Sequence, residues 1–154
     1  MIFPTLKKLS LLKLPNLVDW KDAMELTTIE MMFPCLVELR IEICGQLTSA
    51  PCHFLSLKKL DVTNIKCMAF ERIISKLSTL ASLKINDITE LVCLPEQLFQ
   101  NNRSLMSIKI SCCFDLVSIS PHQDVTFPSL EMFEVFNCPN LRSFLILQGA
   151  GSCL

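Results

Sequence analysis

The chain has 154 residues, 51% of them hydrophobic, and its 14 basic and 15 acidic residues give a net charge of −1. This balance excludes a strong positive field of the kind that attracts nucleic acids and anionic membranes. No apolar run reaches the ~20 residues of a transmembrane helix, and the charges of Lys7, Lys8 and Lys13 argue against a signal peptide.

Six copies of one apolar pattern follow each other along the chain. Each copy has apolar residues at offsets 0, 3, 5, 8 and 11 from an anchoring leucine, and all thirty positions are apolar. Around offsets 3 and 5, apolar and other side chains alternate, as they do on the two faces of a short strand. The wider spacing of offsets 8 and 11 suits a turn. A unit with one apolar edge folds only when copies stack beside it, so the pattern predicts a repeat array. The anchors are Leu6, Leu36, Leu57, Leu80, Leu105 and Leu130.

The first three repeats differ mainly in the segments that return from one strand to the next. Repeat one begins at Phe3-Pro4 and is followed by the longest return segment, residues 20–32, for which we expect one or two helical turns. Trp20 is interpreted as a packing residue on the side opposite the strands. After repeat three, residues 69–77 have apolar residues at i, i+3, i+4 and i+7, which predicts an amphipathic helix.

The later repeats are less regular. Repeat five starts near Asn102 without a Phe-Pro pair, and the polar residues 120–126 after it predict a loop. Residues 148–154, with Gly and Ser, are predicted to be a flexible tail. Neither end of the array has a polar flanking segment, so we interpret the chain as a piece of a longer repeat domain.

Two short motifs recur within the repeats. Phe-Pro-x-Leu opens three of them, at Phe3, Phe33 and Phe127. Cys-x-x-Leu follows three of the predicted strands, at Cys44, Cys113 and Cys138. Together with the run LPEQLFQNNRSLMSIKISCCFDL at residues 94–116, they resemble the leucine-rich repeats of plant nucleotide-binding leucine-rich-repeat (NBS-LRR) disease-resistance proteins of the coiled-coil type. The resemblance covers residues 3–144.

The resemblance implies an α/β leucine-rich-repeat solenoid over residues 1–147. We expect a short parallel sheet of about six strands on its concave face, with irregular loops and short helical turns on its convex face. Many leucine-rich repeats have Asn at offset 8, but here the position is Cys three times and aliphatic three times. We therefore expect irregular turns there, with backbone polar groups bonded to other backbone groups or to water.

The chain has nine cysteines and no Cys-x-x-Cys pair. Cys44, Cys113 and Cys138 stand at equivalent repeat positions, so we interpret these three as reduced core residues and expect a cytosolic or nuclear setting. Cys52-His53 and Cys112-Cys113 come closest to metal or nucleophile chemistry, but a zinc site needs four converging ligands. Cys112 is expected to face solvent and Cys113 the core. The chain contains no Gly-x-x-x-x-Gly-Lys-Ser/Thr loop. We expect no metal, no cofactor and no enzymatic activity, and nucleotide binding is not carried over from the family.

With enzymatic and cofactor functions not expected, we expect the exposed side of the strands to recognise another protein. The charges there either solvate an exposed sheet or form a polarised binding surface, basic toward the first four repeats and apolar and acidic at repeat six. The candidate protein-binding residues are Lys8, Arg40, Lys59, Asp61, Lys84, Lys109, Glu134 and Phe136.

The resemblance implies the sensing and autoinhibitory part of an intracellular plant immune receptor. Its partners would be the receptor's own nucleotide-binding module or a pathogen effector, with no nucleic acid and no membrane involved. Two alternatives stay open at this point. One is the substrate-binding repeat adaptor of a ubiquitin ligase, and the other is a truncated product without an independent function.

Overall fold

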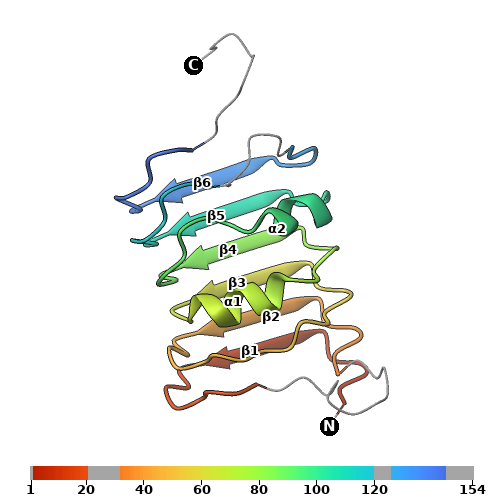
Figure 1. Ribbon diagram of the computed structural model, residues 1–154. Helices are drawn as coiled ribbons and strands as arrows, with labels where there is room; N and C mark the ends of the chain where they lie inside the picture. The colour runs from red at the N-terminus through yellow and green to blue at the C-terminus, as the bar shows by residue number, and fades with distance from the viewer. Residues whose placement is uncertain (1, 21–31, 120–125, 145–154) are drawn as a thin grey trace.

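The computed structural model describes residues 2–20, 32–119 and 126–144, which form an α/β structure with one six-stranded parallel sheet. The strands lie side by side in sequence order (Figure 1). They are β1 (Lys8–Leu12), β2 (Glu38–Glu42), β3 (Lys59–Thr63), β4 (Ser82–Asn86), β5 (Ser107–Ser111) and β6 (Met132–Phe136). Two short helices, α1 (Cys67–Ile74) and α2 (Glu96–Asn101), follow β3 and β4. The predicted α/β class and parallel sheet are confirmed.

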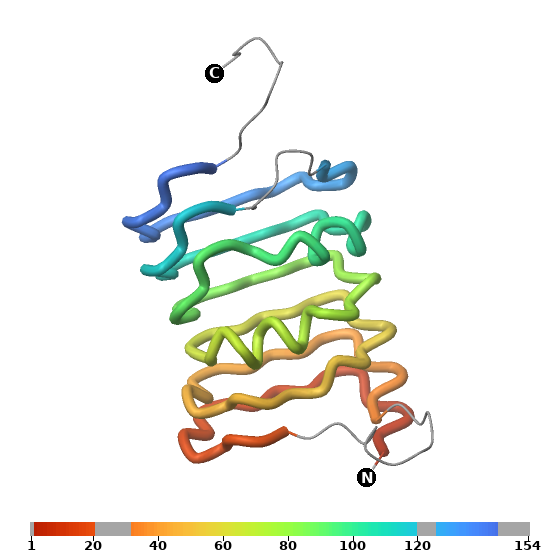
Figure 2. The backbone as a smooth tube through the Cα atoms, in the orientation of Figure 1, coloured from red at the N-terminus to blue at the C-terminus, as the bar shows by residue number. Residues whose placement is uncertain are grey.

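The described parts of the return segments form a second layer on one face of the sheet, and α1 and α2 belong to that layer (Figure 2). Apolar side chains at offsets 0, 3 and 5 fill the space between the layers. In β2 to β5 they are fully buried, whereas in β1 and β6, which have a neighbour on one side only, they are half-buried. The predicted pairing register is confirmed: the row at offset 5 joins Leu11, Ile41, Val62, Ile85, Ile110 and Val135.

The predicted core position at offset 11 is wrong in repeat three. Met68 is 65% exposed, and Cys67 is buried in its place. The reason is that α1 begins at Cys67, directly after the bridge residue Lys66, so this repeat lacks the two-residue turn that separates offsets 8 and 11 in repeats one, two, five and six. The helix therefore begins two residues before the predicted range 69–77 and ends at Ile74.

The turns after the strands are regular, which corrects the expectation of irregular turns. In all six repeats the residue at offset 7 has a left-handed backbone, with φ between 51° and 55°. In each of the first five repeats, the backbone N–H of this residue donates to the last carbonyl of the next strand, as Lys13 N does to Glu42 O at 2.8 Å. Where offset 8 is cysteine, the thiol lies near a strand carbonyl, and Cys44 Sγ is 3.5 Å from Glu42 O. Backbone groups thus serve one another without an asparagine at offset 8.

In the first three repeats, an aromatic ring occupies the position three residues before the anchoring leucine. Phe3 stacks on Phe33 with ring centroids 5.5 Å apart, and Phe33 stacks on Phe54 at 6.1 Å. Trp20 packs against both Phe33 and Phe54, at 5.8 and 5.9 Å. The interpretation of Trp20 as a packing residue is confirmed.

Asn102 occupies the same position in repeat five and is only 2% exposed. Its side-chain amide donates to Leu77 O at 2.9 Å and Leu98 O at 2.8 Å, and its side-chain oxygen accepts from Leu80 N at 3.0 Å. A polar side chain therefore joins repeats four and five where the other repeats have apolar residues. Within the described ranges, every buried side-chain nitrogen and oxygen has a hydrogen-bond partner.

Within the described part of the chain, no helix has the length and apolar character needed to cross a membrane. The helical turns expected in residues 20–32, the loop expected in 120–126 and the tail expected in 148–154 fall wholly or almost wholly outside the described residues.

Candidate protein-binding surface

The side of the sheet that faces away from the return segments presents three rows of side chains, at offsets 2, 4 and 6, which we call the open face. Its first row is Lys8, Glu38, Lys59, Ser82, Ser107 and Met132; its middle row is Ser10, Arg40, Asp61, Lys84, Lys109 and Glu134; its third row is Leu12, Glu42, Thr63, Asn86, Ser111 and Phe136. The structure brings all eight candidate residues onto this one face. Their role in binding stays a prediction.

Ion pairs link the charges of the first three strands. Lys8 and Lys59 both approach Glu38, with nitrogen–oxygen distances of 3.5 and 3.9 Å. Arg40 pairs with Glu42 on its own strand and lies 4.0 Å from Asp61 on β3. The basic residues of β1 to β3 are therefore matched by carboxylates on adjacent positions.

The last three strands carry a different arrangement. Lys84 and Lys109 are direct partners in the register of β4 and β5. Lys109 Nζ lies 3.7 Å from Glu134 and 5.6 Å from the centre of the Phe136 ring, so its ammonium points toward β6. Among the described residues, Lys84 has no ion-pair partner. On the open face, the lysine without an ion-pair partner thus lies on β4, in the last of the four repeats toward which the basic residues concentrate.

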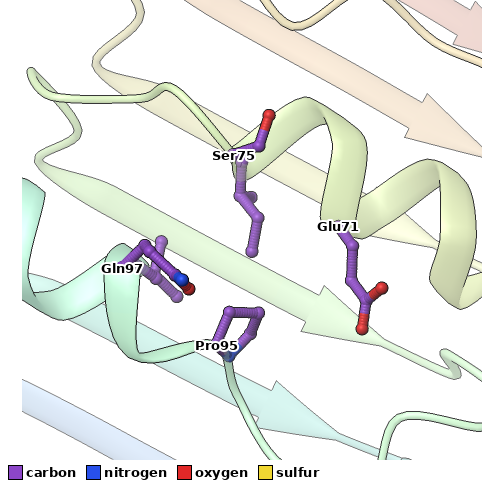
Figure 3. Close-up of a pocket in the computed structure, with 6 residues that line it drawn as sticks. Glu71, Ser75, Pro95 and Gln97 are labelled. Atoms are coloured by element: carbon purple, nitrogen blue, oxygen red, sulfur yellow. The ribbon is translucent and has the colours of Figure 1, made fainter.

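The opposite face has grooves on both sides of α1. One of about 360 Å³ separates α1 from α2, and Glu71, Ser75, Pro95 and Gln97 surround its mouth in Figure 3. The other, of about 530 Å³, lies beside Met68 and Arg72. None of the eight candidate residues lines either groove. Among the described residues that line the two grooves, Glu71 is the only acidic one, so these residues include no paired carboxylates of the kind that acid–base catalysis uses.

The Cys52-His53 pair is brought close in the structure. Cys52 Sγ lies 3.4 Å from His53 Nδ1, and Lys76 Nζ lies 3.1 Å from His53 Nε2. Across the described ranges, no group of three or more His, Cys, Asp and Glu residues is placed to hold a metal ion.

The two adjacent cysteines of repeat five face different surroundings, as predicted. Cys113 is fully buried, while Cys112 is partly exposed and its sulfur accepts from Asn137 Nδ2 at 3.3 Å. The cause differs from simple strand alternation, because Cys112 is the left-handed turn residue with φ 53°. The eight cysteines in the described ranges form no disulfide with one another.

We predict that a thiol reagent at pH 8 labels Cys112 faster than Cys113. Burial raises the pKa of Cys113 from 9.0 to about 11, and the thiolate is the reactive form. Because this pKa is raised by folding, the neutral buried thiol stabilises the fold fully below pH 9, and this contribution is lost as the pH rises through about 11. Tandem mass spectrometry of labelled peptides locates the label, and faster labelling of Cys113 would contradict the assignment.

Comparison with models of known protein families, with curated proteins and with solved structures finds no match to this chain.

Proposed function

We propose that this chain is a leucine-rich-repeat solenoid that recognises another protein through the open face. One observation carries the proposal: six strands in constant register present eighteen side chains in three straight rows. Adjacent strands are ~4.8 Å apart, so a partner that crosses them meets one side chain of each row per strand. The backbone ladder holds these positions, which limits the ordering cost of binding.

The composition of the open face suits a protein partner. It mixes ion-paired charges, hydroxyl groups and exposed apolar residues such as Leu12 and Phe136, which are 42% and 52% exposed. Interfaces between proteins combine apolar contacts with a polar surround in this way. Basic and acidic residues alternate along much of the middle row, so the register of the partner contributes to specificity.

The resemblance noted in the sequence gives this recognition a context. In our proposal the chain is the sensing and autoinhibitory part of an intracellular plant immune receptor, and its partner is the receptor's nucleotide-binding module or a pathogen effector. The support consists of the thirty apolar repeat positions and the Phe-Pro-x-Leu and Cys-x-x-Leu motifs.

The coding sequence upstream of Met1 tests this context directly. We expect it to encode a nucleotide-binding module, which can then be expressed and mixed with the chain. An F-box-like helical module in the same place would favour the ubiquitin-ligase adaptor instead and would overturn the receptor proposal.

We predict that Arg40→Glu combined with Lys84→Glu weakens association with that module at least tenfold in calorimetry. The double reversal changes the middle row at two strands and breaks the Arg40 ion pairs, which as exposed pairs contribute about 0.2–1 kcal/mol each. The melting temperature should therefore fall by only a few degrees.

The matched control reverses Arg103 and Arg142, which are exposed, lie outside the open face and make no side-chain hydrogen bond or ion pair with other described residues. Arg72 is unsuitable because its Nε donates to Ala50 O at 2.8 Å. Loss of binding in the control pair with full binding in the open-face pair would place recognition elsewhere.

A further inference from the structure

Lys84 and Lys109 are like-charged neighbours on the open face. They stand directly opposite each other on adjacent strands, where like charges destabilise a sheet. The rest of the face avoids this arrangement, because Lys8 and Lys59 flank a glutamate and Arg40 faces Asp61. A local rule that is broken at one place on an otherwise balanced surface points to a functional reason.

The neighbours of the lysine pair do not neutralise it. Asp61 is the register partner of Lys84 on β3, but its ion pair, at 4.0 Å, is with Arg40 and not with Lys84. Glu134 is a single carboxylate that pairs with Lys109 from the far side. The remaining open-face residues of β4 and β5 are uncharged: Ser82, Asn86, Ser107 and Ser111. This part of the face therefore has hydrogen-bonding groups and an excess of positive charge, with no acid on either of the two strands' open-face positions.

An apolar area adjoins the lysine pair on the side of β6. Met132 and Phe136 are 43% and 52% exposed, and Met106, just before β5, is 44% exposed. Phe136 also contacts the ammonium of Lys109, at 5.6 Å from the ring centre. A ligand that reaches both lysines can therefore continue onto an apolar contact without leaving the face.

We propose that β4, β5 and β6 bind an extended acidic segment of the partner protein, with two carboxylates two residues apart and an apolar residue following them. This inference rests on the proposed function and names the partner's chemistry. Side chains at i and i+2 of an extended segment are ~6.6 Å apart, which the flexible lysine stems span from adjacent strands. The carboxylates pair with Lys84 and Lys109, and the apolar side chain lies against Phe136.

The segment relieves the repulsion within the lysine pair as it binds. Exposed ion pairs are individually weak, so an isolated short peptide is expected to bind with a Kd on the order of 1 mM. The affinity should fall as salt is raised from 0.05 to about 0.5 M, because added ions screen exposed charges. In the intact partner, contacts along the other rows add to this affinity.

The test uses three acetylated peptides and the isotope-labelled chain, followed by NMR shifts of assigned backbone amides. The peptides are Gly-Glu-Gly-Glu-Gly-Leu-Gly, the same peptide with Gln in place of both Glu residues, and the same peptide with Ser in place of Leu. We expect the first to shift amides of β4 to β6, the Gln peptide to bind at least fivefold more weakly, and the Ser peptide to lose the shifts near Phe136. Equal binding of the Gln peptide overturns the proposal.

Two double variants with the same change of net charge separate a local site from general attraction. Lys84→Gln with Lys109→Gln should reduce binding of the acidic peptide at least fivefold. Lys7→Gln with Lys58→Gln, at exposed lysines without ion-pair partners in the described ranges, should change it less than twofold. Equal loss in both variants, or equally tight binding of an oligouridylate of the same charge, shows that only positive charge is recognised and overturns the proposal.

The outcome is independent of the test of the proposed function. If the nucleotide-binding module binds the open face but the acidic peptide does not shift β4 to β6, only the acidic-segment inference fails. If the module binds elsewhere, the proposed function fails even when the peptide binds at the lysine pair.

Discussion

Replacing Ile85 by Asp is expected to lower the free energy of unfolding by roughly 3–5 kcal/mol, a large part of the about 5–15 kcal/mol that holds an ordinary domain folded. Ile85 is fully buried in the middle of β4, and its neighbours in the register are Val62 and Ile110. A carboxylate there has no partner for its charge and cannot reach water. Urea unfolding followed by circular dichroism measures the loss.

The control for this variant is the same substitution one residue earlier. Lys84→Asp puts the carboxylate on the exposed side of the same strand and removes the like-charge contact with Lys109. Its unfolding free energy should stay within about 1 kcal/mol of the parent. Equal destabilisation by the two substitutions would show that the assignment of faces in β4 is wrong.

The second large effect is expected at Asn102. Asn102→Leu keeps the approximate volume of the side chain but removes the three hydrogen bonds to Leu77, Leu80 and Leu98. Buried backbone groups left without partners cost about 1–3 kcal/mol each, with carbonyls at the lower end. We expect a loss of roughly 2–4 kcal/mol and faster hydrogen exchange at the Leu80 amide.

The neighbouring Asn101 provides the control for Asn102. It is exposed at the end of α2, so Asn101→Leu should leave both the unfolding free energy and the Leu80 exchange rate nearly unchanged. If Asn102→Leu is as stable as the parent, the amide is not what joins repeats four and five.

The strand register and the two faces of the sheet could be predicted from the sequence. Strand side chains alternate with period two, and the constant spacing of offsets 0 to 8 leaves only one alignment of neighbouring strands. The same alignment predicts that Arg40, Asp61 and Lys84, which all stand at offset 4, lie in one row, and the register confirms it. The strands were therefore the predictable part of the fold.

The return layer was less predictable, because a turn and a helix begin with similar apolar spacing. In repeat three the pattern fits Met68 as well as Cys67, and only the start of α1 decides that Cys67 is buried. Asn102 gave no apolar signal and was interpreted as the start of a repeat. Its buried role depends on the carbonyl of Leu98 in α2 and on that of Leu77, which follows α1, and sequence spacing does not locate either.

The regular turns left a weak signal that the sequence interpretation missed. Three of the six left-handed residues at offset 7 are Asn64, Asp87 and Asn137, and Asn and Asp are enriched in that conformation. The location of the uncompensated charge had no such signal. It depends on which carboxylate each lysine reaches, and Lys109 reaches Glu134 while Lys84 reaches none in the described ranges.

The central claim is that the open face binds the partner protein, and lysine acetylation footprinting tests it without any substitution. The chain is treated briefly with an acetylating reagent alone and with the nucleotide-binding module at saturation, and each lysine is quantified by mass spectrometry. The account predicts that acetylation of Lys84 and Lys109 slows at least threefold when the module is bound. Lys66, directly before α1, and Lys76, just after it, should be acetylated at the same rate with and without the module. Protection of Lys66 and Lys76 with unchanged Lys84 and Lys109 would contradict it.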